Sequence, residues 1–319
     1  MRKIRNYTIA AVLLAVWIFG YVLDSGITNS VLSSGLRFGM PLALAAMVGI
    51  MCERSGVINI GIEGTMLLSG FFGFYAGVYT KNVLLGFGAA ILAGIAASFL
   101  HAMMTIVWKM DQIIAGTIIN ILPSGLTSFL YVAGVTIPNN WPIFDIPVLS
   151  KLPLVGQSLF SQQGPVQYLG LIFIPLIWVM MYKTRWGLRT RSIGENPGSA
   201  DTAGVSVIRM RITNVVLGGA IGGLVGGFIC LELVGSFSKE FTAGAGFTAL
   251  ALMIFGRWNP LGAFAAAIAF GLAQALSTQL QIFGVQEIPQ QFINILPYVF
   301  TIARSEEHTS ELQSRGLIS

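Results

Sequence analysis

Charged residues are scarce in this chain. Only 10% of its 319 residues are Asp, Glu, Lys or Arg, whereas 55% are hydrophobic, and the mean hydropathy is +0.77. A soluble domain carries about 25% charged residues, so most of this chain faces something other than water. Apolar runs of about 20 residues, the length that crosses a bilayer, recur along nearly the whole sequence. We therefore predict an all-α, polytopic membrane protein.

Residues that carry out catalysis or bind metals are also few. There are two cysteines, Cys52 and Cys230, and two histidines, His101 and His308, and none belongs to a cluster with metal-ligand spacing. No Gly-Lys dipeptide occurs, so a Walker A loop is absent, and no Gly-x-Ser-x-Gly pattern occurs either. The sequence predicts neither an enzyme nor a disulfide framework, and no metal site or cofactor in this chain. The modest net charge of +5 does not indicate nucleic-acid binding.

The apolar runs predict about ten spans. The third and the eighth contain glycines that allow a broken or re-entrant helix. The predicted spans are 7–23, 31–51, 57–80, 83–107, 113–134, 165–182, 212–235, 243–256, 261–283 and 289–303.

The basic residues predict the orientation of these spans. With the N-terminus in the cytoplasm, twelve Lys and Arg residues fall on the cytoplasmic side and three outside, as the positive-inside rule requires. The cytoplasmic set is Arg2, Lys3, Arg5, Arg54, Lys109, Lys183, Arg185, Arg189, Arg191, Arg209, Arg211 and Arg257. The outside set is Lys81, Lys151 and Lys239.

The C-terminal stretch departs from this pattern. The tenth predicted span runs for only about fifteen residues, from Pro289 to Ala303, which is short for a crossing. The run Arg304–Ser314 then resembles the translation of a sequencing-library adapter. We therefore expect one transmembrane domain, 1–303, followed by an artefactual tail, 304–319.

A basic loop, 183–211, contains a short predicted helix. Asn196 can cap its N-terminus, Pro197 suits the first helical position, and Gly204 can end it in the left-handed conformation. The predicted helix, Pro197–Ala203, has too little apolar surface to belong to a core. It suits docking into a groove on a partner, and an ordinary connector is the alternative interpretation.

Three separated segments carry a resemblance to a known family. The segments 53–65 (ERSGVINIGIEGT), 194–204 (GENPGSADTAG) and 255–262 (FGRWNPLG) together resemble permease subunits of bacterial ABC importers. The resemblance runs from about residue 30 to residue 303. It is to the branch that handles simple sugars, nucleosides and branched-chain amino acids, and the nucleoside-type permeases are the most similar.

The resemblance implies a set of partners and a bacterial inner-membrane location. The partners are an ATPase that holds the ATP and Mg²⁺, a second permease subunit, an extracytoplasmic substrate-binding lipoprotein and membrane lipid. It also implies that the loop helix couples ATP binding to the spans. The family pattern there is Glu-Ala-Ala-x-x-x-Gly, whereas the acidic residue of this chain lies earlier. The implied coupling residues are Glu195, Asn196, Pro197, Ala200, Asp201, Ala203 and Gly204.

Several intramembrane residues are further candidates. Gly218, Gly222 and Gly226 form a small-x-x-x-small stripe, which favours close helix packing; lining the pathway is the alternative. A carboxylate within a span should face the protein or a cavity, and the alternatives for Glu63 are an ion pair with Arg54 and contact with substrate. The predicted pathway residues are Asn59, Glu63, Asn120 and Gln274. Hydrogen bonds between helices would also explain the three amide side chains among them.

Two other classes of protein stay open at this point. An ion-coupled secondary transporter would need an intramembrane acid, for which Glu63 is the only candidate in the predicted spans. A non-transporting membrane scaffold would need no such residue. We expect instead an ATP-driven importer for nucleosides, with simple sugars or branched-chain amino acids as the alternative substrates.

Overall fold

The computed structural model describes residue 21 and residues 24–137, 143–145, 150, 156–161 and 163–282. Its regular secondary structure in these residues is helical. Two π-helical segments, η1 and η2, continue α4 and α10. In chain order the helices are α2 (Ser25–Glu53), α3 (Ile62–Thr80), α4 (Val83–Ala102), η1 (Met103–Val107), α5 (Gln112–Leu130), α6 (Gly156–Phe160), α7 (Pro165–Lys183), α8 (Arg185–Glu195), α9 (Pro197–Thr202), α10 (Val207–Gly227), η2 (Phe228–Val234), α11 (Ala245–Phe255) and α12 (Pro260–Ile282).

Helix α2 is the central helix of the bundle. Every residue from Gly39 to Cys52 is buried, which is the pattern of a helix that is surrounded on all sides. Asp24 caps its N-terminus, because its side chain accepts hydrogen bonds from the backbone N–H groups of Gly26 and Ile27. The helix packs against α12, α10, α11 and α7.

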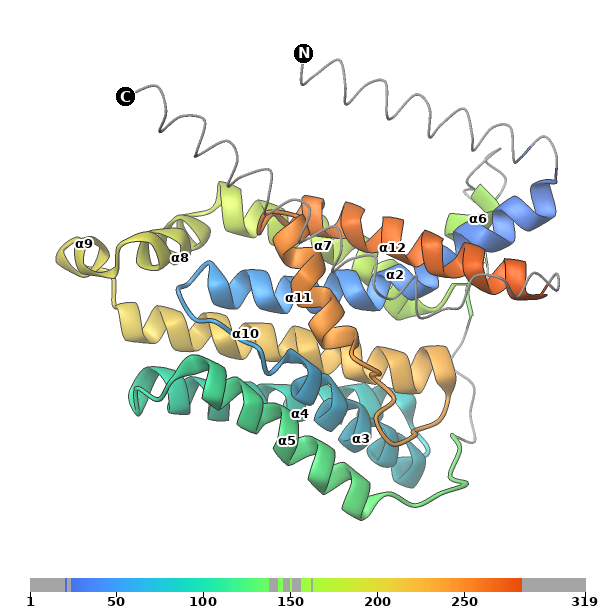
Figure 1. Cartoon of the computed structure of the whole chain (residues 1–319), viewed down its shortest axis with the longest axis horizontal. Coiled ribbons are helices and arrows are strands. Elements are labelled where there is room, and N and C mark those ends of the chain that lie inside the picture. The colour runs from blue at the N-terminus through green and yellow to red at the C-terminus, as the bar shows by residue number, and fades with distance from the viewer. Residues whose placement is uncertain are drawn as a thin grey trace, which may run out of the picture.

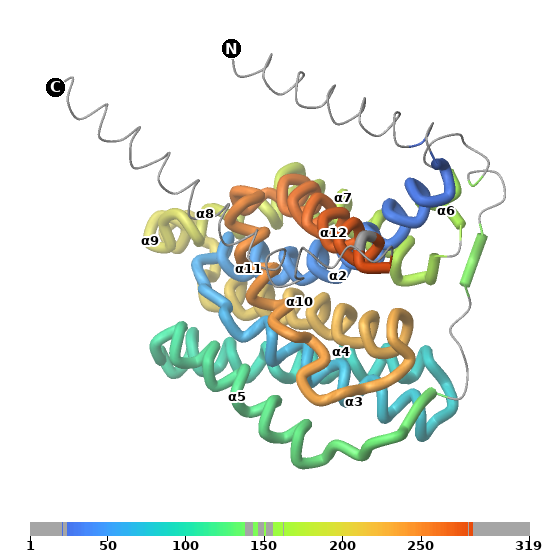
Figure 2. Tube along the Cα trace, turned by 45° about the vertical axis from the view of Figure 1, so that its right-hand side comes forward, coloured from blue at the N-terminus to red at the C-terminus, as the bar shows by residue number. Residues whose placement is uncertain are grey.

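The other long helices lie on either side of α2 and α10 (Figures 1 and 2). On one side α3, α4 and α5 lie together, and on the other side are α7 and α12. Helix α11 crosses obliquely between them (Figure 1). The outer helices expose large apolar side chains, among them Ile121 of α5 and Ile172 of α7, each 66% exposed. Such faces are expected where a membrane helix meets lipid.

Six of the helical segments are long and apolar enough to cross a membrane. They correspond to six of the ten predicted spans, and the predicted spans 7–23 and 289–303 lie outside the described residues apart from residue 21. The structure therefore does not establish ten spans. The six segments are Ser25–Glu53, Val83–Val107, Gln112–Leu130, Pro165–Lys183, Val207–Val234 and Pro260–Gln279.

The predicted third and eighth spans differ from simple membrane-crossing helices. The third is helical only from Ile62 onward, and residues 57–61 are not helical. The eighth is helix α11, whose 11 residues reach about 17 Å at about 1.5 Å per residue. That length is about half of a bilayer core. Both departures are at the glycine-rich positions where the sequence allowed a break.

Hydrogen bonds gather several basic loops at one end of the bundle. Arg54 donates to the carbonyl oxygens of Trp258 and Arg257 and to the hydroxyl of Tyr182, each at 3.3 Å. Arg211 donates to the carbonyl oxygen of Ser55 at 3.1 Å. Helices α8 and α9 project at this same end (Figure 1). Loops that the charge pattern assigned to the cytoplasm are thus neighbours in space.

Candidate functional site

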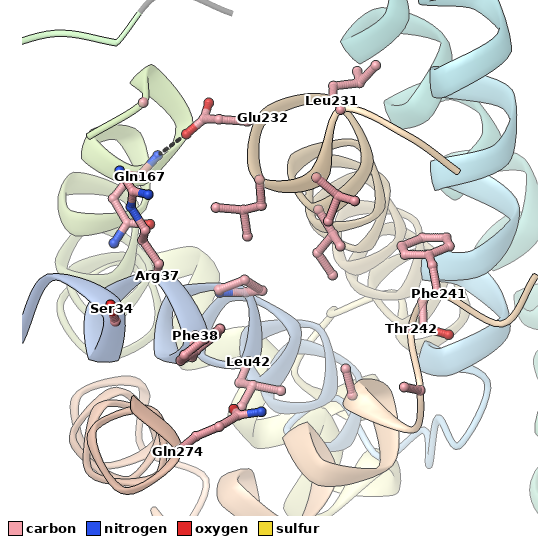
Figure 3. A pocket seen from close by; sticks show the side chains of 18 of the residues that line it. Ser34, Arg37, Phe38, Leu42, Gln167, Leu231, Glu232, Phe241, Thr242 and Gln274 are labelled. Atoms are coloured by element: carbon pink, nitrogen blue, oxygen red, sulfur yellow. Dashed lines mark hydrogen bonds between the residues drawn. The ribbon is translucent and has the colours of Figure 1, made fainter. Parts of the chain in front are cut away.

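A cavity of about 1130 Å³ lies between α2, α7, η2, the loop that follows η2, the start of α11 and the middle of α12. Figure 3 shows Arg37, Gln167 and Glu232 on one side of it and Phe241 and Thr242 on the other. The elements that form its walls are far apart in the sequence. They meet because α2, in the centre of the bundle, contacts α7, η2, α11 and α12.

The carboxylate of Glu232 fixes the polar side of the cavity. It accepts a hydrogen bond from the backbone N–H of Val166 at 2.9 Å and another from the N–H of Gln167 at 3.2 Å. These are orphan donors in the first turn of α7, where a negative charge is favoured. A side chain at Gly164 would collide with this carboxylate. Glu232 therefore joins η2 to the start of α7.

The side chain of Gln167 is 1% exposed and lines the same wall. Neither its amide oxygen nor its amide nitrogen has a hydrogen-bond partner among the described residues. Leaving a buried polar group unsatisfied costs about 1–3 kcal/mol, so such groups are rare in folded proteins. Both polar atoms are also closed to solvent, so the carboxamide is an unsatisfied group packed within the wall of the cavity.

Three aromatic rings belong to the remaining surface, beside aliphatic side chains. Phe38 of α2, Phe241 of the loop and Phe270 of α12 all line the cavity. Phe241 packs edge-on against Phe237, with ring centroids 5.3 Å apart, so the loop carries a small aromatic cluster. The cavity thus combines aromatic faces with one arginine, one glutamate and several amide and hydroxyl groups.

One of the four predicted pathway residues, Gln274 of α12, lines this cavity. Asn59 and Asn120 instead hold the non-helical residues before α3. The side chain of Asn59 accepts from the N–H of Gly61 at 3.0 Å. Asn120 of α5 accepts from the N–H of Gly64 at 2.8 Å and donates to the carbonyl oxygen of Ile60 at 3.1 Å.

Glu63 bonds backbone groups in a similar way. Its two carboxylate oxygens accept hydrogen bonds from the N–H groups of Gly244, at 2.8 Å, and Gly246, at 2.6 Å. These groups lie at the N-terminus of α11, so Glu63 caps a short helix with its charge. The side chain of Arg54 instead bonds Tyr182, Arg257 and Trp258, and the ion pair with Glu63 that we considered is not formed.

The loop helix forms as α9, with the caps that the sequence predicted. The side chain of Asn196 accepts from the N–H of Ser199 at 3.0 Å. Gly204 has φ +78°, and the N–H of Val205 bonds the carbonyl oxygen of Ala200 at 3.0 Å, which is a Schellman motif. Among the predicted coupling residues only Ala200 is buried. Glu195, Asn196, Pro197, Asp201, Ala203 and Gly204 are all exposed.

Comparison with known proteins identifies the family to which this chain belongs. The family model described as the branched-chain amino acid transport system / permease component matches residues 31–303. The chain belongs to this family. It is 36% identical over 286 residues to the nucleoside ABC transporter permease protein NupC of Lactococcus lactis, covering 85% of this chain and 90% of that protein. It is 36% identical over 291 residues to the guanosine ABC transporter permease protein NupQ of Bacillus subtilis, covering 86% and 91%.

A solved structure has a similar fold. It is an ABC transporter in an inward-facing conformation, described as of the metal-chelate type. The match has a TM-score of 0.50 and 19% identity and covers 88% of this chain and 86% of that one. Membership of the permease family and the six long apolar helices make this chain a multi-pass membrane protein and a transport subunit.

The glycines of α10 allow the helices of the permease to approach closely. A Cβ at Gly226 would collide with the carbonyl oxygen of Met66 in α3, and one at Gly222 would lie 3.1 Å from Thr65. Gly218 faces α2, where the sulfur of Cys52 lies 3.3 Å from such a Cβ. A second stripe, Gly219, Gly223 and Gly227, faces α4. None of these glycines lines the cavity.

Sequence reasoning missed three residues of the cavity in this permease. Arg37, Gln167 and Glu232 all lie within segments that are apolar enough to cross a membrane. Glu63 is therefore not the only carboxylate within the predicted spans, which corrects our statement that it was the sole candidate. The signal was present, since a charged residue in an apolar span marks a functional position. Glu232 lies near the end of Val207–Val234, whereas Arg37 lies well inside Ser25–Glu53.

Proposed function

We propose that this permease is the membrane-spanning subunit of an ABC importer that moves nucleosides inward across the bacterial cytoplasmic membrane. The observation that carries the proposal is the 36% identity, over most of both chains, to two proteins named as nucleoside and guanosine ABC transporter permeases. The cavity is consistent with this substrate class. Its aromatic rings and amide groups suit an uncharged solute with one apolar face and several polar edges.

The rest of the importer would consist of separate chains. An ATPase that binds ATP and Mg²⁺ would dock on α9, whose exposed residues end in a rigid Schellman turn. A second permease subunit and an extracytoplasmic binding lipoprotein would complete the transporter. Helix α9 supports this assignment because it packs on α8 and α10 and can pass a motion from the ATPase to the spans.

An ion-coupled transporter is a poorer description of this geometry. A coupling acid has to gain and lose a proton or an ion during the cycle. Both oxygens of Glu63 are engaged by backbone N–H groups, and the oxygens of Glu232 are engaged in the same way. Both carboxylates are therefore engaged in holding the first turns of α11 and α7.

Uptake by proteoliposomes tests the proposed function. The permease would be reconstituted with its ATPase, second permease and lipoprotein, and labelled guanosine would be added outside with ATP trapped inside. We expect uptake that requires hydrolysable ATP and is inhibited by inosine but not by leucine or glucose. Uptake driven by an ion gradient without ATP, or competition by leucine or glucose, would contradict the proposal.

A further inference from the structure

We propose that the turn between α2 and α3, residues 54–56, is the relay that passes a movement of α8 and α9 to the centre of the bundle, with Arg54 as its positioning residue. This inference rests on the part of the proposed function in which an ATPase docks on α9, and it adds the route that the motion then takes. A route is needed because α9 has 6 residues and packs on α8 and α10, whereas α2 is the central helix.

The first observation is that α8 lies directly on this turn. A Cβ at Gly194, in the last turn of α8, would collide with the carbonyl oxygen of Arg54. From the other side, a Cβ at Gly56 would lie 3.4 Å from the Cα of Gly194. The two backbones therefore touch with no side chain between them, and a shift of α8 acts on the backbone of the turn.

The second observation is that Arg54 joins this turn to the turn between α11 and α12. Its guanidinium donates to the carbonyl oxygens of Arg257 and Trp258, each at 3.3 Å. These consecutive residues have φ +59° and +53°, a conformation that is uncommon without glycine and needs support from its surroundings. The indole of Trp258 also donates to the carboxylate of Glu53. Two neighbouring residues at the end of α2 thus hold the turn that follows α11.

The third observation is that the middle of the turn is fixed from a different helix. The guanidinium of Arg211 in α10 donates to the carbonyl oxygen of Ser55 at 3.1 Å. Ser55 is 0% exposed, and its hydroxyl donates to the carbonyl oxygen of Cys52 in the last turn of α2 at 2.7 Å. A buried segment that is held on every side passes on a displacement, because close-packed interiors are hard to compress.

The test measures guanosine taken up per ATP hydrolysed by the reconstituted importer. Arg54→Lys keeps the positive charge, but an ammonium lacks the planar fork of donors that holds two carbonyl oxygens. We expect the ratio to fall about tenfold, within the range of roughly 5–150-fold typical of coupling between sites. A loss of folded protein alone would lower uptake and hydrolysis together and leave the ratio unchanged. Arg209→Lys, at an exposed position in α10, is the control and should not change the ratio.

A variant on α8 tests the same contact if Arg54→Lys does not assemble. Gly194→Ala places a Cβ against the carbonyl oxygen of Arg54 and should also lower the uptake per ATP. Gly88→Ala is the matched control, because Gly88 is an exposed helical glycine of α4 whose Cβ would meet no described atom within 4 Å. It should keep the wild-type ratio.

A distance measurement tests the relay with all of its contacts in place. Spin labels would be attached to cysteines at Leu188 of α8 and Leu261 of α12, which are 61% and 41% exposed. We expect their separation to stay the same when a non-hydrolysable ATP analogue is added, whereas the distance from Leu188 to Tyr79 of α3, 80% exposed, should change. A change in the first distance, or no change in the second, would overturn the relay.

The outcomes separate this inference from the proposed function. If the wild-type importer takes up guanosine, but Arg54→Lys and Gly194→Ala lower uptake and ATP hydrolysis in proportion, the turn is only structural and only the inference fails. If the wild-type importer takes up no nucleoside, the proposed substrate fails. The distance measurement needs no solute, so it still decides whether α8 and the turn after α11 move together.

Discussion

The carboxylate of Glu63 shows how a single intramembrane charge can be structural. It bonds two backbone N–H groups at the start of α11, where the donors of the first turn have no intrahelical partners. The cost of exposing a carboxylate to lipid predicts that it faces the protein. Its partner could not be predicted, because Gly244 lies 181 residues further along the chain and no local pattern connects the two.

Replacing this charge should destabilise the permease. In Glu63→Gln one carboxylate oxygen becomes an amide N–H₂ group that faces a backbone N–H, so one hydrogen bond is lost and the other is weakened. We expect the free energy of unfolding to fall by about 1.5–3 kcal/mol, the range for hydrogen bonds to charged groups, seen as a lower thermal midpoint in detergent. Glu240→Gln, in an exposed loop position, is the control and should not change the midpoint.

Transport measurements decide between this role and direct contact with substrate. If Glu63→Gln kept the wild-type thermal midpoint but lost guanosine uptake, the carboxylate would act on the solute, and its role as a helix cap would be secondary.

The polar cavity residues show the same limit of prediction. Arg37, Gln167 and Glu232 come from three different elements, and only the packing of α2 in the centre brings them together.

At the scale of elements, helix α9 shows what local sequence can predict. Asn196, Pro197 and Gly204 each act on backbone groups within a few residues, so the order of residues alone specifies the start and end of the helix. The structure confirms the helix and both caps. It also shows that Ala200 is buried, so contacts with an ATPase would come from the exposed neighbours, Asp201 among them.

A substitution at Gly204 tests whether α9 couples ATP binding to transport. An added Cβ would meet no atom within 4 Å, but the residue has φ +78°, a conformation that costs a β-branched side chain about 1–2 kcal/mol. We expect Gly204→Val to lower ATP-driven uptake more than it lowers the amount of protein in the membrane. Gly204→Asn should largely retain uptake, because asparagine tolerates this conformation.

Gly134 provides a matched control for this substitution. It has φ +79° and also has no atom near its Cβ position, but it follows α5, far from α9 in the sequence. Gly134→Val should introduce the same strain without uncoupling the importer. Equal losses of uptake per molecule in Gly134→Val and Gly204→Val would show that strain alone explains the effect, and that α9 has no special role.

At the scale of the whole molecule, hydropathy predicted the positions of the long helices well. It overestimated the lengths of α3 and α11. Composition cannot distinguish a helix that crosses the bilayer from one that enters a bundle of other helices. Glycines at both positions indicated a break, but the bonds that stabilise the break come from Asn59, Asn120 and Glu63. Those are tertiary contacts, which cannot be predicted from a single sequence.

The orientation of the permease is the last prediction, and two matched serines can test it. Arg54, Arg211 and Arg257 meet at the end where α8 and α9 project, and the positive-inside rule assigns that end to the cytoplasm. Ser199 of α9 and Ser238 of the loop after η2 are both exposed. In intact cells, Ser238→Cys should react with a membrane-impermeant maleimide, whereas Ser199→Cys should react only after the membrane is permeabilised. The parent chain should stay unlabelled, since its two cysteines are buried. The reverse pattern would invert the topology and place α9 where no ATPase can reach it, so this one measurement would overturn the proposed coupling as well as the orientation.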